Sequence, residues 1–315
     1  MTSLRDIREA ANAIAEKVHR TPLLASRTLG DRFGCRLSLK PECFQKTGSF
    51  KVRGVFNRLR MLSVEERERG VIGISAGNHA QALAYGAAAE RVQCTVVMPA
   101  HASQTKVDAS RGYGAEVILH GNVFEAFAYM EQLRDERGLT LVHPYDDPHV
   151  IAGQGTAGLE IMEDVPDAAV VIVPIGGGGL ISGIAAAVKQ LHPSTRVIGI
   201  EPTGAPAITV ALEKNEPVRL ESINTIADGL SAPIAGVNTL AHIKEFVDDV
   251  VLVSDDALRA ATSLVLERCK ILLEPAGAAG IAALIEGKIS TKPNQHVVVV
   301  ASGGNYDLQR LKNDL

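Results

Sequence analysis

The segment from Ala168 to Val188 reads AAVVIVPIGGGGLISGIAAAV and contains no charged residue. Its β-branched first part, Ala169–Val173, favours a buried strand. Four consecutive glycines at 176–179 then predict a turn, and the small residues from Leu180 onward favour a helix. The segment is long enough to cross a bilayer, but Pro174 and the glycines would break such a helix at its centre. It therefore predicts a strand, a glycine turn and a helix in a packed interior.

The same alternation of apolar runs and helical stretches continues along the chain. Strands are predicted at 36–40, 71–74, 95–98, 116–119, 140–142, 170–173, 197–200, 250–253 and 297–300. Helices are predicted between several of them, at 78–89, 123–136, 180–190 and 255–267. Continuous apolar strands followed by helices are typical of parallel sheets covered on both faces. We therefore predict an α/β fold of two lobes, with the ligand site between them at the carboxyl ends of the strands.

Composition limits the function classes. The chain has 315 residues, 46% of them hydrophobic, with a net charge of -4 and no basic stripe, which argues against a nucleic-acid partner. Its four scattered cysteines lack the spacing of a zinc site and are typical of reduced thiols in a cytoplasmic protein. The first 18 residues are amphipathic and partly acidic, which is unlike a signal peptide. We expect a soluble protein with no membrane partner.

The glycine run is the first candidate binding site. Consecutive glycines let backbone N–H groups converge, and the start of a helix adds positive potential, so the natural ligand is a phosphate. A tight turn in a packed interior is the alternative. No Gly-Lys-Ser/Thr follows, and Ile181 breaks the Gly-x-Gly-x-x-Gly pattern. These departures argue against a nucleoside-triphosphate loop and against a dinucleotide site.

A second segment places one lysine among apolar residues and glycine. Lys51 stands in the run SFKVRG at 49–54, after a polar turn at 45–48. Neighbours that remove water from an amine weaken its charged form, and the neutral amine is the nucleophile. Lys51 is therefore a candidate for forming an imine.

Two further serine- and glycine-rich segments lie beside predicted strands. The run SAGNH at 75–79 offers N–H groups and the Asn78 amide to a carboxylate, although a helix N-cap explains it as well. The run SGGN at 302–305 ends a buried strand. There the Ser302 hydroxyl can bond a ring nitrogen, and a simple turn is the alternative.

In this order, the motifs resemble the threonine/serine dehydratase (ammonia-lyase) and serine racemase family. The resemblance rests on QKTGSFKVRG (45–54), SAGNHAQ (75–81), IAGQGT (151–156), PIGGGGL (174–180) and SGGN (302–305). It extends from about Thr21 to Asp307. The family consists of pyridoxal-phosphate enzymes of fold type II, the tryptophan-synthase-β-like fold.

The resemblance implies a role for each segment. Lys51 would bond the cofactor covalently and act as the catalytic base, the glycine run would hold the phosphate, Asn78 the phenolic oxygen and Ser302 the pyridine nitrogen. The cofactor-binding residues would be Phe50, Lys51, Asn78, Gly176, Gly177, Gly178, Gly179, Leu180, Gly229, Glu274 and Ser302. The substrate carboxylate would bind Ser75, Ala76, Gly77, Asn78 and His79.

The resemblance also implies the organisation of the molecule. Residues 1–65 and 148–315 would form a large cofactor-binding domain, and residues 66–147 a small domain. The family expectation is a cytoplasmic homodimer that acts on a small amino acid.

The implied reaction is β-elimination from L-threonine or L-serine, giving 2-oxobutanoate or pyruvate plus ammonia. Serine racemases carry a serine where this chain has Ala76, and alanine cannot transfer a proton. A serine at the ring nitrogen also favours prompt loss of the β-hydroxyl over racemisation. An amino-acid racemase and a 3-hydroxyaspartate dehydratase remain alternatives within the family. A β-replacement synthase and a non-enzymatic nucleotide-binding protein are alternatives outside it.

Some relatives bind a divalent cation after the strand that ends at Glu201. Glu201 and the carbonyl of Ala205 match that pattern, but Ala207 replaces the later aspartate. A hard cation would then depend on water and backbone oxygens. We therefore expect no resident metal, and a cation near Glu201 and Ala205 is the alternative.

Overall fold

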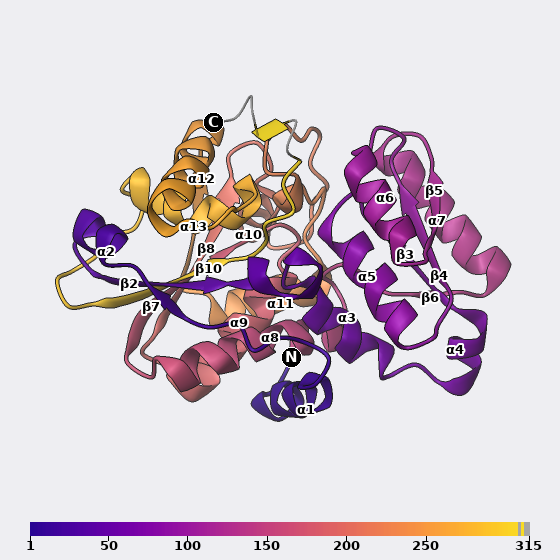
Figure 1. Ribbon diagram of the computed structural model, residues 1–315, viewed down its shortest axis with the longest axis horizontal. Coiled ribbons are helices and arrows are strands. Elements are labelled where there is room, and N and C mark those ends of the chain that lie inside the picture. Colours follow the sequence, from indigo (N-terminus) through magenta and orange to yellow (C-terminus); the bar gives the residue numbers. More distant parts are fainter. Residues whose placement is uncertain (308–309, 312–315) are drawn as a thin grey trace.

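The computed structural model describes residues 1–307, 310 and 311, and contains two sheets flanked by helices (Figure 1). Within these residues the large sheet has the order β1 (Leu24–Ala25), β2 (Arg36–Pro41), β10 (His296–Ala301), β7 (Ala168–Pro174), β8 (Arg196–Pro202) and β9 (Asp249–Val253). The small sheet has the order β5 (Glu116–Leu119), β4 (Cys94–Met98), β3 (Val71–Ile74) and β6 (Thr140–Leu141). Apart from β1, which runs antiparallel to β2, the paired strands are parallel.

The helices alternate with the strands, as parallel crossovers require. The α-helices are α1 (Leu4–Ile14), α2 (Arg27–Phe33), α3 (Lys51–Leu59), α4 (Val64–Arg69), α5 (Asn78–Ala89), α6 (Gln104–Gly112), α7 (Val123–Arg137), α8 (Pro148–Asp164), α9 (Gly179–Leu191), α10 (Ala207–Lys214), α11 (Val237–Phe246), α12 (Asp255–Cys269) and α13 (Pro275–Ile285). Short 3-10 turns are η1 (Glu42–Phe44), η2 (Lys46–Gly48) and η3 (Asp228–Leu230).

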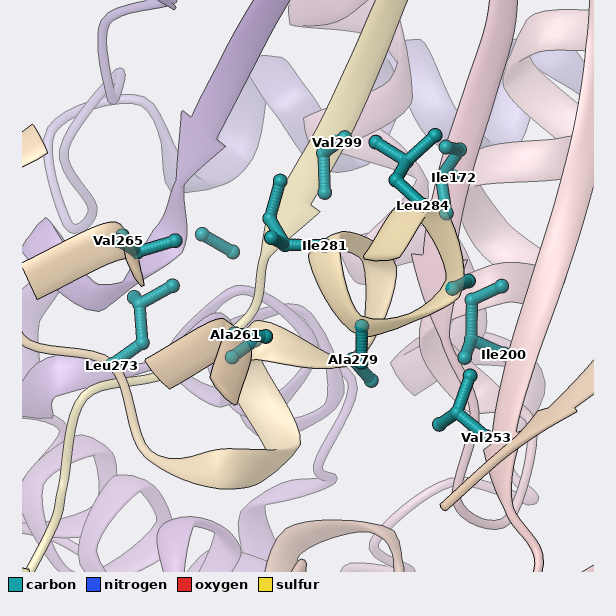
Figure 2. Close-up of a cluster of buried hydrophobic side chains, with 14 of the residues drawn as sticks. Ile172, Ile200, Val253, Ala261, Val265, Leu273, Ala279, Ile281, Leu284 and Val299 are labelled. Carbon is teal, nitrogen blue, oxygen red and sulfur yellow. The ribbon is translucent and has the colours of Figure 1, made fainter. Parts of the chain in front are cut away.

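The large sheet is buried on both faces because its central strands are apolar at nearly every position. Ile172 of β7 faces the cluster built by α12 and α13, and Figure 2 shows Ala261, Val265 and Ile281 among the members of that cluster. Its neighbour Val171 faces the opposite cluster, built largely by α8 and α9. Burying a Val, Leu or Ile side chain contributes about 1.5–3 kcal/mol relative to exposure, so these two layers dominate the stability of the lobe.

The small sheet has the same two-sided packing. Val96 of β4 lies in a cluster with residues of α3 and α5, and Val97 faces α7 on the other side. Helix α3 packs against both α5 and α8, so it lies between the two sheets (Figure 1). The helix that begins with Lys51 therefore joins the two lobes.

The predicted α/β class is confirmed, and each predicted strand is present. The predictions for 71–74 and 116–119 coincide with β3 and β5, whereas no sequence pattern predicts β1. β1 has two residues, too few to carry a periodic pattern. Among the described residues, none of the helices combines the length and hydropathy that spanning a bilayer requires.

Candidate active site

The two loops that carry Lys51 and Ser302 are paired directly. Ser49 and Gly303 form an isolated antiparallel bridge, and the Phe50 amide donates to the Ser302 carbonyl at 3.2 Å. The Gly304 amide donates in turn to the Gly48 carbonyl at 3.0 Å. The segment before α3 is thus fixed to the loop that follows β10.

Asn78 joins these loops to the small lobe. Its side-chain Nδ2 donates to Glu274, and its Oδ1 accepts from Asn305 Nδ2 at 2.8 Å. A Cβ at position 303 would lie 2.5 Å from a Glu274 oxygen and 3.1 Å from Asn78 Nδ2, so only glycine permits this approach. Four segments far apart in sequence meet at this point.

Lys51 is the first residue of α3, and its amine lies in this site. Its Nζ donates to the Pro144 carbonyl at 2.7 Å and lies 5.1 Å from the centre of the Phe50 ring. Loss of water around the amine lowers the pKa of Lys51 to about 8. A lysine in this state supplies a neutral amine near physiological pH, which both imine formation and proton abstraction need.

The run at 75–79 lies between β3 and α5, which begins at Asn78. The Gly77 amide donates to the Ser75 hydroxyl at 3.0 Å. His79 is buried and its Nε2 donates to the Val142 carbonyl at 2.8 Å, while burial lowers the pKa of His79 to about 3. The imidazole is therefore neutral and already engaged. What this segment, including Ala76, presents to an anion is the main chain at the start of α5.

The glycine run forms the predicted turn between β7 and α9. Gly178 has φ 95°, a left-handed conformation that favours glycine, and α9 begins at Gly179. Thr239 Oγ1 donates to the Gly177 carbonyl at 2.8 Å and holds the turn. Because the first N–H groups of a helix have no partner inside it, the amides from Gly179 and Leu180 onward are available to an anion.

Gly229 connects the glycine run with Glu274. A Cβ at position 176 would lie 3.2 Å from the Gly229 carbonyl oxygen, and one at position 229 would lie 3.6 Å from a Glu274 oxygen. Glu274 is 4% exposed, and its burial raises the pKa of that carboxyl. Its side-chain partner among the described residues is Asn78, whose Nδ2 donates to it.

The structure adds residues that sequence reasoning missed. A side chain at position 177 would overlap the ring of Tyr145, whose hydroxyl donates to the Ile234 carbonyl at 2.9 Å. Lys106 of α6 lies 3.7 Å from Asp228, and its Nζ would be 3.8 Å from a Cβ at position 77. These contacts join residues from different elements, so no local pattern indicates them.

The residues present fit pyridoxal phosphate. The glycine run and the start of α9 form a cradle that a side chain at position 177 would disturb. The buried hydroxyls of Thr47 and Ser49, close to Lys51 in sequence, have no hydrogen-bond partner within the described part of the chain. Unpartnered buried hydroxyls are uncommon and are expected where a bound polar group completes a site.

The Glu201 carboxylate is occupied by hydrogen bonds from the main chain of α10. Its carboxylate accepts from the Ile208 amide at 2.7 Å and from the Thr209 amide at 2.9 Å, at the start of α10. Burial raises the pKa of Glu201 to about 7. Among the described residues, no group of three or more histidine, cysteine or acidic side chains is arranged to hold a metal ion.

Comparisons with known proteins agree with this geometry. Residues 14–303 match the family model described as pyridoxal-phosphate dependent enzyme. An L-threonine ammonia-lyase from Thermotoga maritima is 44% identical over 99% of this chain and 77% of its own length. The structure of maize serine racemase superposes with a TM-score of 0.94 at 37% identity, covering 99% of this chain and 96% of that one.

The T.th. threonine deaminase is also similar, with a TM-score of 0.91 and 42% identity over 97% of this chain and 99% of that one. The family match spans nearly the whole chain, and the fold is the one that the resemblance implied. This chain belongs to the pyridoxal-phosphate-dependent enzyme family and has its type II fold.

Proposed function

We propose that this chain is a threonine/serine ammonia-lyase. L-Threonine would lose water, and the enamine released would take up water to give 2-oxobutanoate and ammonia; L-serine would give pyruvate. The observation that carries the proposal is the Lys51 amine, with a pKa of about 8, in the same site as the main-chain anion site at 75–79. The similarity to an L-threonine ammonia-lyase and a threonine deaminase supports it.

Each residue contributes a step that its environment permits. The main chain from Ser75 to His79 binds the substrate carboxylate at the start of α5. Lys51, when neutral, takes the α-proton at its Nζ. Pyridoxal phosphate, when bound, supplies the electron sink for the charge that develops at the α-carbon. The glycine run and Leu180 would hold its phosphate, Asn78 and Ser302 would bond its polar ring atoms, and Phe50, Gly229 and Glu274 would support the ring.

Amino-acid racemisation is the second candidate, favoured by the similarity to maize serine racemase. It requires a proton donor on the face of the α-carbon opposite Lys51. Ala76 offers none, which supports elimination as the main reaction.

The test is to incubate the holoenzyme separately with L-threonine and L-serine. The 2-oxo acids and ammonia are quantified, and recovered serine is separated by chiral chromatography. We expect one 2-oxo acid per ammonia and little D-serine. Production of D-serine in excess of pyruvate would replace the lyase proposal by a racemase. In Ala76→Ser, the ratio of D-serine to pyruvate should increase.

We also propose the broader organisation that the family resemblance implies. Residues 1–65 and 148–315 form the large domain and 66–147 the small one, which is supported by a separate sheet at β3 to β6. We propose a cytoplasmic homodimer whose small-molecule partner is an amino acid. A divalent cation near Glu201 and Ala205 remains the lesser proposal, since both carboxylate oxygens of Glu201 already accept bonds from α10.

A further inference from the structure

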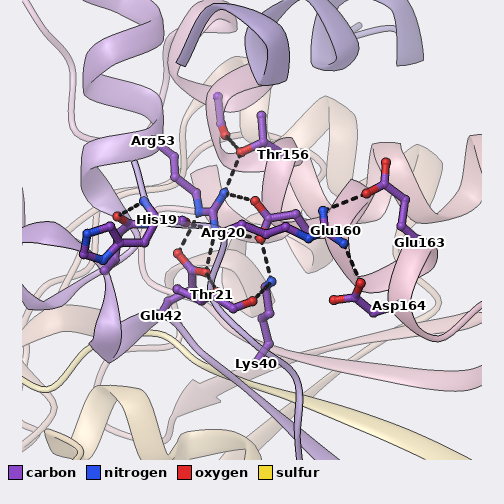
Figure 3. A network of polar contacts seen from close by, with 12 residues as sticks. His19, Arg20, Thr21, Lys40, Glu42, Arg53, Thr156, Glu160, Glu163 and Asp164 are labelled. Carbon is purple, nitrogen blue, oxygen red and sulfur yellow. Dashed lines mark hydrogen bonds and ion pairs between the residues drawn. The ribbon is translucent and has the colours of Figure 1, made fainter. Parts of the chain in front are cut away.

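A buried cluster of ionic groups lies two residues along α3 from Lys51. Arg53 is fully buried and bonds two carboxylates at once (Figure 3). Its Nε and Nη2 donate to Glu42 at 2.8 Å each, and its Nη1 and Nη2 donate to Glu160 at 2.7 and 2.9 Å. Nη1 also donates to Thr156 at 3.1 Å.

A second cation balances the cluster. Lys40 is fully buried and donates to Glu160 at 2.5 Å and to the Thr21 carbonyl at 2.7 Å. Two cations thus face two carboxylates. Exchanging such a cluster for apolar residues of similar volume is often neutral or stabilising, because desolvation offsets the attraction between the charges. The cluster contributes geometry, because the planar guanidinium of Arg53 fixes the positions of the Glu42 and Glu160 carboxylates.

The side chains that bond Arg53, and Lys40 beside them, come from three other elements, of which α8 packs directly against α3. Glu160 and Thr156 belong to α8, Glu42 to η1, and Lys40 to β2. Helices α3 and α8 touch backbone to backbone, since a Cβ at position 153 would lie 2.6 Å from the Gly54 Cα. The acceptor of the Lys51 amine, the Pro144 carbonyl, lies just before α8. A displacement of α3 relative to α8 would therefore move the Lys51 amine relative to the Pro144 carbonyl.

We propose that Arg53 is a positioning residue, which with Glu42, Glu160 and Lys40 holds the start of α3 so that the Lys51 amine stays in its partly dehydrated place. Arg53 acts through the helix and contacts no reacting atom. The inference rests on the proposed function in taking Lys51 as the reacting amine.

The test compares two Arg-to-Lys substitutions. Arg53→Lys keeps the charge but replaces the fork by one ammonium, which cannot hold both carboxylates in the same geometry. The matched control is Arg20→Lys: Arg20 bonds Glu163 and Asp164 of the same helix but is half exposed (Figure 3). For Arg53→Lys we expect kcat to fall about tenfold to a hundredfold, as small misplacements of catalytic groups do, with KM within about twofold. Arg20→Lys should match the wild type.

A second readout does not depend on turnover. In the full chain stripped of cofactor, acetylation of Lys51 is followed by mass spectrometry as a function of pH. The wild type should show a midpoint of about 8, and Arg53→Lys a midpoint displaced toward the ordinary lysine value of about 10.4. The Lys51 charge also acts on His79 and His143, whose burial lowers their pKa values to about 3 and about 4. Both imidazoles are neutral between pH 8 and pH 10, so the midpoint of the acetylation curve measures the titration of the Lys51 amine.

The outcomes separate the two proposals. A displaced midpoint in Arg53→Lys supports positioning even if the wild type proves inactive on threonine and serine, which would reject only the function. A folded Arg53→Lys with unchanged kcat and unchanged midpoint, but a lower melting temperature, would overturn positioning. If Arg53→Lys does not fold, Glu160→Asp provides the test, because it keeps the charge and withdraws the carboxylate by about 1.5 Å. Unchanged kcat and midpoint there would overturn the inference equally.

Discussion

The Phe50 amide donates to the carbonyl oxygen of Ser302 at 3.2 Å, although the two residues come from opposite ends of the chain. Phe50 immediately precedes Lys51, and Ser302 immediately follows β10. The amine that is proposed to react and the hydroxyl that is proposed to face the cofactor ring nitrogen are thus held by one backbone contact. A substitution that displaces Phe50 should therefore also displace Ser302, and a substitution that displaces Ser302 should also displace Phe50.

The first prediction concerns the pH dependence that burial of Lys51 imposes on stability. The amine has a pKa of about 8 in the folded chain and about 10.4 when unfolded. Between these values the unfolded chain binds more protons, so the contribution of Lys51 to the free energy of unfolding rises with pH. Below pH 8 the full cost of the buried charge is present. Lys51→Met should therefore stabilise the cofactor-free chain by up to about 3 kcal/mol at pH 7, and by much less near pH 10.

Urea denaturation of the wild type and Lys51→Met at both pH values measures this difference. Lys214→Met, at an exposed position that ends α10, serves as the control and should show little difference at either pH. An equal effect of Lys51→Met at pH 7 and pH 10 would mean that the amine is not dehydrated.

Catalysis gives a second test of the same residue. In the holoenzyme, Lys51→Ala should abolish turnover.

The second prediction concerns the glycine run. Gly177→Val would displace the Tyr145 ring and keep a phosphate away from the main chain. Each lost N–H contact to a charged oxygen costs about 1.5–3 kcal/mol, so the cofactor dissociation constant should rise roughly tenfold or more. Absorbance titration measures affinity, and thermal unfolding of the cofactor-free chain measures the fold. Gly112→Val, where nothing lies within 4 Å, is the matched control. Unchanged affinity in a folded Gly177→Val would leave only a packing role.

The third prediction concerns Ser302, which is 5% exposed at the end of β10. Ser302→Asp places a carboxylate where the ring nitrogen is proposed to lie, and an opposite charge at contact distance favours protonation by about one pK unit or more. Elimination should slow, and a long-wavelength absorption band should appear with substrate. Ser302→Ala should bind the cofactor more weakly without that band. If Ser302→Asp binds cofactor with an unchanged spectrum, the hydroxyl is not at the ring nitrogen.

The fourth prediction concerns the ion pair between the lobes. Lys106 of α6 and Asp228 of η3 lie 3.7 Å apart, and Arg310 also bonds Asp228 at 2.7 Å. The Asp228 side chain is 52% exposed, so the Lys106 pair contributes only about 0.5–1 kcal/mol. Lys106→Met should raise KM a few-fold and reduce its dependence on ionic strength. Arg137→Met breaks an exposed pair within the small lobe and should leave KM unchanged. A salt dependence of KM identical to that of the wild type would show that the pair does not contribute to KM.

Local patterns are sufficient to predict most of the fold. The strands at 71–74 and 116–119 are predicted to the residue, because apolar runs between turn residues report burial directly. The motifs at 49–54, 75–79 and 302–305 are expected to meet because the ligand site is predicted between the two lobes, at the carboxyl ends of their strands. The bridge between Ser49 and Gly303 and the bonds of Asn78 bring these segments together.

The contacts that could not be predicted are those between elements of different lobes or layers. Arg53 is visible in the sequence only as part of the lysine motif, because its partners Glu42 and Glu160 carry no signal of their own. Tyr145 lies in a loop, and its place against the glycine run depends on how α8 begins. His79 is predicted among the carboxylate-binding residues, and the sequence does not indicate that its side chain bonds the Val142 carbonyl. Side-chain direction depends on tertiary packing that a motif does not encode.

The position of β10 has a consequence for biosynthesis. It is the last of the described strands in chain order, yet it lies between β2 and β7 and pairs with both. While the ribosome is still making residues 296–301, β2 has no neighbour on that side and the Lys51 loop has no partner. A nascent chain thus exposes an unpaired apolar strand edge, which invites aggregation and chaperone binding. Cofactor capture can begin only after this late strand has been synthesised and inserted between β2 and β7.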